Sequence, residues 1–124
     1  MIWANERKTG RYFPYIPALR LSEEVGTRIP ELLGGSAELG LGHQFVDRQR
    51  RFDPATDLTD SPAGYHLFGL EASYTRPLGG RQSLRLTLSA DNLLNTQYKE
   101  YTNRARYYSH DVGRDIRFSL HYKF

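Results

Sequence analysis

Apolar and polar side chains alternate along several stretches of the chain, most regularly over 83–91 and 115–124. In the second stretch, apolar residues occupy every even position from Ile116 to Phe124, and polar residues occupy the odd positions between them. Successive side chains of a β-strand point to opposite faces, whereas a helix would scatter these apolar residues around its circumference. The pattern therefore predicts strands with one apolar face and one polar face.

Weaker alternation predicts further strands over 18–25, 37–47 and 64–78, and Ile2–Ala4 has the composition of a strand's end. The connectors between these strands run long, short, long, short, long, over 5–17, 26–35, 48–63, 78–81 and 95–111. Short turns at one rim and long loops at the other are typical of transmembrane barrel meanders. We therefore expect an all-β fold, an antiparallel up-and-down meander of about six strands that forms a partial transmembrane β-barrel.

Composition narrows the possible classes of protein. The 124 residues have the length of one domain, and nine Tyr and six Phe favour strands over helices. Without cysteine, the chain has neither disulfides nor thiolate metal sites. The net charge of +3 is dispersed, and we interpret its densest basic stretch, Arg48–Arg51, as a solvated loop. We therefore expect no nucleic-acid partner.

Two environments would cover the apolar faces of such strands. One is the hydrocarbon of an outer membrane, which tilted strands of about 9–11 residues cross. The other is the interior of a small soluble β-barrel or sandwich that binds an apolar ligand, which requires the face carrying Leu84 to point inward. A chain that stays monomeric without detergent would support the soluble alternative.

Four short motifs lie at the boundaries of the expected strands. They are Pro17-x-x-Arg20, Gly64-Tyr65 after an acidic loop, Asn92-Leu93-x-Asn95-x-x-Tyr98, and Gly113-Arg114 before the last strand. In this order and spacing they resemble motifs in the C-terminal part of TonB-dependent outer-membrane receptors. The resemblance covers nearly the whole chain, and each motif alone has low specificity.

The resemblance implies that residues 1–124 are the C-terminal segment of a receptor barrel, without the plug domain or the TonB box. Met1 is followed at once by Ile2 and Trp3 with no signal-peptide pattern, so we expect the leader to lie upstream. The implied location is the bacterial outer membrane, with its lipid and the barrel-assembly machinery as partners. The implied function is TonB-energised uptake, through the absent plug, of a siderophore, haem or other metal complex.

Three groups of site residues follow from this interpretation. An external loop is expected to contact the ligand, with the candidates Tyr101, Asn103, Arg104, Arg106, Tyr107 and Tyr108. The polar parity of the strands is expected to face the lumen, with the members Glu38, Gln44, Glu71, Arg85, Asp91, Arg117 and Lys123. The terminal signal for barrel assembly is expected to comprise Gly113, Phe118, Tyr122 and Phe124.

Other chemistry has weaker support. The four histidines lack close ligand spacing, and the acidic residues of 53–60 lack the spacing of an EF-hand. We interpret Asp91 and Glu71 as ion-pair partners of nearby basic residues, in preference to an acid–base pair. Asn92 and Asn95 either contact a ligand or hold the rim where a strand becomes a loop. We predict no metal site, no cofactor and no enzymatic activity.

Overall fold

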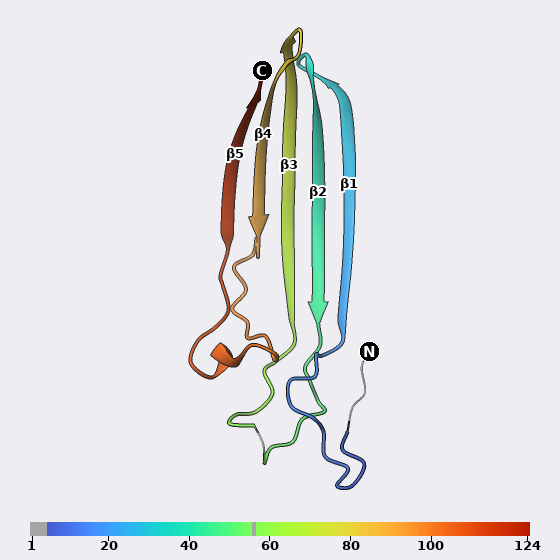
Figure 1. The fold of residues 1–124 in the computed structure, drawn as a ribbon, viewed down its shortest axis with the longest axis vertical. Coiled ribbons are helices and arrows are strands. Elements are labelled where there is room, and N and C mark those ends of the chain that lie inside the picture. Colours follow the sequence, from blue (N-terminus) through green and yellow to red (C-terminus); the bar gives the residue numbers. More distant parts are fainter. Residues whose placement is uncertain (1–4, 56) are drawn as a thin grey trace. The chain divides into compact units, whose positions relative to one another are not determined.

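The computed structural model describes residues 5–55 and 57–124, which form one five-stranded sheet (Figure 1). Its elements are β1 (Arg20–Leu32), β2 (Gly35–Val46), β3 (Tyr65–Gly79), β4 (Gln82–Asp91), the 3₁₀ helix η1 (Arg104–Tyr107) and β5 (Asp115–Lys123). The strands lie in sequence order and pair antiparallel. The expected all-β antiparallel meander is confirmed, and the strand end expected at Ile2–Ala4 lies outside the described residues.

The register of the central strands keeps like side chains on the same face. In β4, Leu86 lies opposite Tyr74 of β3 and Leu120 of β5. The next residue, Thr87, lies opposite a serine in each neighbour. Because side chains alternate along every strand, the alternating apolar residues of β3, β4 and β5 all lie on one face of the sheet. The polar residues between them lie on the other face.

The first two strands continue this arrangement. The ring of His43 on β2 stacks on Phe68 of β3, with centroids 4.7 Å apart, and its Nδ1 lies 2.7 Å from the Glu23 carboxylate of β1. On the opposite parity, Arg28 of β1 lies 3.8 Å from Glu38 of β2. Both β1–β2 contacts fit a single antiparallel register, so the two faces extend across all five strands.

The connector expected over 26–35 is wrong. The β1 strand continues through Pro30 to Leu32, and the turn consists of Leu33 and Gly34, both with positive φ. Proline is tolerated because β1 is an edge strand, where a backbone N–H can be lost from the outer side. The correction sharpens the alternation of connector lengths, because the β3–β4 turn is equally short while 47–64 and 92–114 are long.

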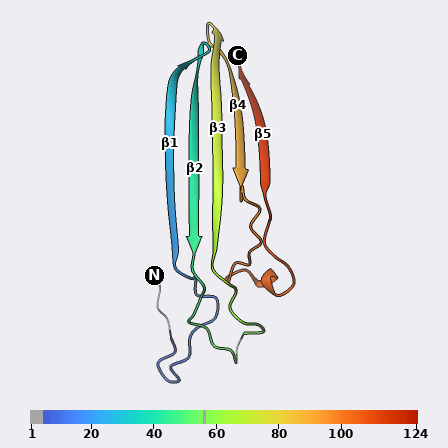
Figure 2. The same cartoon turned by 180° about the vertical axis from the view of Figure 1, so that it is seen from behind.

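The sheet is a single open layer, with β1 and β5 as its edges (Figure 2). Large apolar side chains on its edge strands are more than half exposed: Leu21, Val25, Ile116, Phe118, Leu120 and Tyr122. Monomeric soluble proteins rarely leave so large an apolar surface uncovered. Within the described residues, therefore, the apolar face does not form a closed dry core.

Contacts divide the chain into two compact units. The sheet unit comprises 22–43, 67–95 and 114–124, and the connector unit comprises the residues up to Leu21 together with 44–66 and 96–113. No helix among the described residues has the length and apolar composition needed to cross a membrane.

The start of β2 is tightly packed against β3. A Cβ atom on Gly35 would lie 2.4 Å from the carbonyl oxygen of Thr75 and 2.8 Å from the Tyr74 hydroxyl. That hydroxyl donates to the carbonyl oxygens of Leu32 and Leu33, at 3.2 and 3.0 Å, and so holds the β1–β2 turn. Gly42, farther along the same strand, has open space where its Cβ would be.

We predict that Gly35→Ala destabilises the sheet, because the added methyl group must push Tyr74 off the turn or separate two backbones. Overpacking of this kind costs about 1–3 kcal/mol. The measurement is the urea midpoint of the chain folded in detergent, and Gly42→Ala on the same strand is the matched control. Equal midpoints for the two variants would contradict the packing at Gly35.

Candidate functional site

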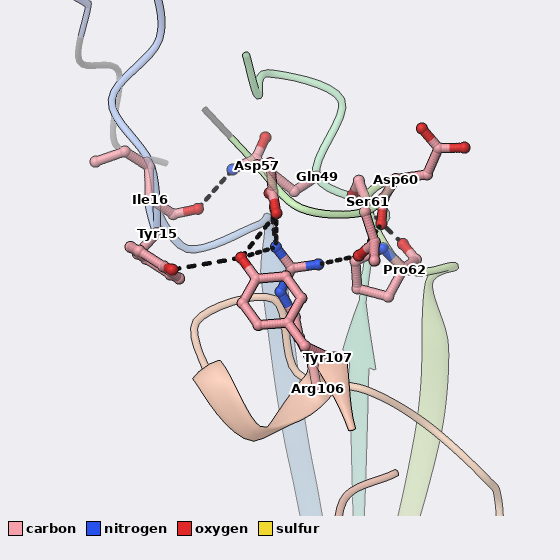
Figure 3. Close-up of polar contacts among 10 residues, drawn as sticks. Tyr15, Ile16, Gln49, Asp57, Asp60, Ser61, Pro62, Arg106 and Tyr107 are labelled. Atoms are coloured by element: carbon pink, nitrogen blue, oxygen red, sulfur yellow. Dashed lines mark hydrogen bonds and ion pairs between the residues drawn. The ribbon is translucent and has the colours of Figure 1, made fainter. Parts of the chain in front are cut away.

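A buried ion pair lies at the centre of the connector unit. The Arg106 guanidinium donates from Nη2 to both carboxylate oxygens of Asp57, each at 2.6 Å (Figure 3). The two side chains are 1% and 5% exposed. Nη1 also donates to the Thr59 hydroxyl at 3.3 Å, so Arg106 contacts the β2–β3 connector at two residues.

Tyrosines surround this ion pair. The guanidinium lies over the ring of Tyr101, 4.8 Å from its centroid, and over the ring of Tyr107 at 4.5 Å. The Tyr107 hydroxyl donates to Asp57 at 2.8 Å and lies 3.3 Å from the hydroxyl of Tyr15. These five residues, named here the Arg106 cluster, come from three segments that are distant in sequence and join them at one point.

Local hydrogen bonds place Arg106 on this cluster. Asn103 caps η1, because its side-chain oxygen accepts from the backbone N–H of Ala105 at 2.9 Å. Its side-chain amide donates to Asp111 at 2.7 Å, and the Asp111 backbone N–H donates to the carbonyl oxygen of Tyr98. The β4–β5 connector is therefore closed upon itself, and this geometry holds the arginine in a defined orientation.

The ionisation states follow from these contacts. Burial acts to raise the pKa of Asp57, but hydrogen bonds from Tyr107 and Arg106 outweigh burial and hold its pKa below the ordinary value. The hydrogen bond with Tyr15, together with burial, raises the pKa of Tyr107. Burial and then the charge of Asp57 raise the pKa of Tyr101. Near neutral pH the carboxylate is therefore charged and both hydroxyls are protonated.

A second polar centre forms around Glu100. Its carboxylate accepts from Arg20 at 2.5 Å and from the Tyr65 hydroxyl at 2.6 Å. The ring of Tyr65 also packs against Tyr98, with centroids 4.5 Å apart. Arg20, Tyr65 and Tyr98 belong to three different motifs of the sequence. The first two meet at the Glu100 carboxylate, and the third packs against Tyr65.

Steric crowding explains why the first residue of the Gly64-Tyr65 motif is glycine. A Cβ atom at Gly64 would lie 2.8 Å from the carbonyl oxygen of Val46 and 3.1 Å from the backbone nitrogen of Arg48. Real Cβ atoms do not approach a backbone oxygen so closely, so a larger residue would move the start of β3. Glycine thus allows Tyr65 to reach Glu100.

The asparagine motif holds the ends of two strands together in the sheet unit. Asn92 and Asn95 both have positive φ, which ends β4 and turns the chain. The Asn95 side-chain oxygen then accepts from the backbone N–H of Arg114 at 3.0 Å, just before β5 begins. These contacts favour the structural interpretation of both asparagines over ligand contact.

The residues expected to face a lumen share the charged face of the sheet. The strand register places five of them on this face: Glu71, Arg85, Asp91, Arg117 and Lys123. Glu38 lies there because it contacts Ser73 and Arg85. Gln44 lies there because it is an even number of residues from Glu38 along β2. Arg85 lies 3.4 Å from Glu38, and Arg117 pairs with Asp91 as well as with Asp115 at 3.2 Å. The predicted pairing of Asp91 with a nearby arginine is therefore confirmed. Among the described residues, no group of three or more acidic or histidine side chains could hold a metal ion.

The expected ligand-contacting loop divides into inward and outward side chains. Tyr101 and Arg106 are buried within the cluster, and Asn103 is used as a cap. Arg104 is exposed, with its guanidinium 5.1 Å from the centroid of the Tyr15 ring, and Tyr108 is 89% exposed. Only the last two of these side chains are free to meet a ligand in this arrangement.

The expected assembly residues all lie in or beside the last strand. Phe118 and Tyr122 share the apolar face, opposite Leu88 and Leu84 of β4. Phe124 is 90% exposed, and its ring centroid lies 6.2 Å from that of Tyr122. Gly113, the remaining member, is exposed just before Arg114.

Sequence reasoning missed three partners. Asp57 is one of several similar acids in its loop, and nothing in the pattern distinguishes it. Glu100 follows the asparagine motif by two residues, without a pattern of its own. Glu23, by contrast, shares the parity of Leu21 and Val25, so its place on the apolar face beside His43 was visible in the alternation.

No protein-family model, curated protein or solved structure matches this chain. Its relation to the receptor family therefore stays a resemblance carried by the four motifs.

We predict that Asp57→Ala lowers the free energy of unfolding by about 3 kcal/mol, because it leaves the buried Arg106 charge unpaired. Urea unfolding followed by tyrosine near-UV circular dichroism measures the loss. The control is Asp60→Ala, an exposed acid in the same connector, which should change the stability by less than about 0.5 kcal/mol. Similar losses of stability in both variants would contradict a specific contribution of the Asp57–Arg106 ion pair.

The lowered pKa of Asp57 also predicts a pH dependence. A carboxylate whose folded pKa is depressed stabilises the fold above its unfolded pKa of about 3.9, and this contribution is lost as the pH falls through the folded pKa. The stability difference between the unmodified chain and Asp57→Asn should therefore be constant near neutrality and shrink below about pH 4. Urea midpoints across this range measure the difference, and a difference that does not depend on pH would contradict a titrating Asp57.

Proposed function

We propose that the chain is a C-terminal wall segment of a TonB-dependent outer-membrane receptor, whose parent barrel takes up a siderophore, haem or other metal complex. The observation that supports this most is the sheet with one apolar and one charged face, neither covered by another layer of described residues. Such a sheet suits a wall between hydrocarbon and water.

In this proposal the apolar face meets lipid. The five strands have 9–15 residues, enough to cross a bilayer when tilted. Hydrocarbon would then cover the side chains of the Leu86 face, which the described residues leave open. Backbone groups along the free edge of β5, and along that of β1 up to Pro30, would pair with further strands of the barrel, because unpaired ones are costly in lipid.

Ionisable residues on the apolar face of the strands lie near strand ends, where they are tolerated. Glu23 lies near the start of β1 and His43 near the end of β2. Arg76, which is opposite Leu84, lies near the end of β3. A charge on the lipid face costs least close to the interface, where long side chains reach the headgroups.

The charged face would line the lumen. There Arg85 and Glu38, and Arg117 and Asp91, offset one another's charge in contact with water. The C-terminus lies at the same end of the sheet as the short turns, since Lys123 pairs with Ser83. The resemblance makes that end periplasmic, so the long connectors would be external.

The Glu100 centre supports the choice of this family within outer-membrane barrels. Three motifs that carry the resemblance are separated by many residues, yet their members Arg20, Tyr65 and Tyr98 are in contact at or beside Glu100. A chance resemblance of isolated short motifs would not require such contacts.

The segment would contribute lipid-facing wall, part of the lumen and external loops, of which Arg104 and Tyr108 are free to meet a ligand. Energy would come from TonB acting on a plug domain outside this chain, so we propose neither transport by the segment alone nor enzymatic activity. A soluble barrel that binds an apolar ligand would need a second layer over the face carrying Leu84, and the described residues supply none.

Spin labels placed along β4 test the membrane assignment, because the chain has no native cysteine to label. We expect nitroxides at 84, 86 and 88, with the chain reconstituted in phospholipid vesicles, to collide with oxygen more often than with a water-soluble nickel chelate. Labels at 85, 87 and 89 should show the reverse. The matched pair is Leu86→Cys and Thr87→Cys, neighbours on opposite faces.

The contrary outcome is equally clear. A chain that stays monomeric without detergent, with labels at 84, 86 and 88 shielded from both reagents, would establish the soluble alternative. Water accessibility at every position would exclude both hypotheses.

A further inference from the structure

We infer that Arg106 is a masked anion-binding site in the connector unit. The carboxylate of Asp57 occupies it, and an anionic ligand with two adjacent oxygens, such as a carboxylate, phosphate or catecholate, can replace Asp57. The inference goes beyond the proposed wall function, because it rests on contacts within the connector unit alone.

The hydrogen bonds of Arg106 are unevenly distributed. Nη2 carries two N–H donors, yet three acceptors approach it: both oxygens of Asp57 at 2.6 Å and the Tyr107 hydroxyl at 3.2 Å. Nε is buried and, among the described residues, has no hydrogen-bond partner. A buried donor without an acceptor is unusual and calls for an explanation.

A ligand anion would correct this imbalance. In the bidentate arrangement typical of arginine, two oxygens accept from two different nitrogens in the guanidinium plane. Asp57 instead places both oxygens on one nitrogen, as Figure 3 shows. An anion placed across Nε and Nη2 would satisfy both nitrogens.

The aromatic rings restrict the chemistry of such a ligand. Tyr101 and Tyr107 lie over the guanidinium, so oxygens reach it most readily at its edge, in its plane. Both tyrosines keep their protons near neutral pH and can donate to an anion as Tyr107 donates to Asp57. The site therefore suits an anionic group that places two oxygens in the plane of the guanidinium, and it rejects cations.

Replacement of Asp57 requires its segment to move, and the described residues around it are exposed. Its neighbours Ala55 and Leu58 are exposed, the latter by 78%. When the Asp57 carboxylate leaves, the entering anion can occupy its space. The positive charge of Arg106 is then neutralised by Asp57 before the exchange and by the ligand after it. Exchange would also free the β2–β3 connector from Arg106 and Tyr107, so binding is coupled to a change in the connectors.

Citrate is a suitable probe, titrated into the full chain folded in detergent at constant ionic strength. Calorimetry measures the affinity, and the ¹⁵N–¹H resonance of Arg106 Nε, assigned by its loss in Arg106→Lys, locates the binding. Asp57→Asn removes the internal competitor while keeping an acceptor, so we expect citrate to bind about 10-fold tighter or more than to the unmodified chain. The Nε resonance should shift on binding, and Asp60→Asn, the matched control, should behave as the unmodified chain.

Two results would overturn the inference. One is an Asp57→Asn variant that binds citrate no more tightly than the unmodified chain. The other is an Arg106→Lys variant with the same affinity as the unmodified chain, because citrate would then neutralise other arginines. If Asp57→Asn loses the far-UV signal of its strands, the test uses the unmodified chain. A citrate-induced shift of the Arg106 Nε resonance then supports the site. No shift at any citrate concentration that leaves the chain folded excludes it.

Discussion

The register of the strands is the constraint on which the rest of the structure depends. Leu86 faces Tyr74 and Leu120 across two strand pairs, and Thr87 faces serines on the other side. A slip of one residue would move every apolar side chain of a strand to the charged face. The register therefore fixes the two unlike faces, and these faces decide which environments the chain can occupy.

The two units satisfy their polar groups in different ways. In the sheet unit, charged side chains lie on one exposed face and pair there, as Arg85 does with Glu38. In the connector unit, Arg106 and Asp57 are removed from water, so each needs the other and the surrounding tyrosines. A buried ion pair adds little net stability, but removal of one partner leaves the other charge buried and unpaired, which is costly. The fold of the connector unit is therefore more sensitive to a change in the Arg106 cluster than the sheet is to a change in its exposed ion pairs.

Much of the fold could be predicted from local pattern. The strands over 83–91 and 115–124 were found because their alternation is regular. The extension of β1 through 26–32 was missed because Gly26 and Pro30 are typical strand breakers. The position of β1 at an edge explains why Pro30 is tolerated, and the close approach of the Leu39 carbonyl oxygen explains Gly26. For the candidate site, the loop with Tyr101, Arg106 and Tyr107 was identified, but the inward orientation of these side chains was not.

The sequence by itself determined which side chains share a face, because alternation is a property of each strand and needs no partner. It also determined where β4 ends and where β3 turns into β4, through asparagine and glycine at positions of positive φ. Only the tertiary structure decided that Asp57 meets Arg106 and that Arg20 meets Glu100, since each pair joins residues far apart in the chain. Such contacts depend on how several connectors fold together, and one charged residue in a loop carries no sign of its distant partner.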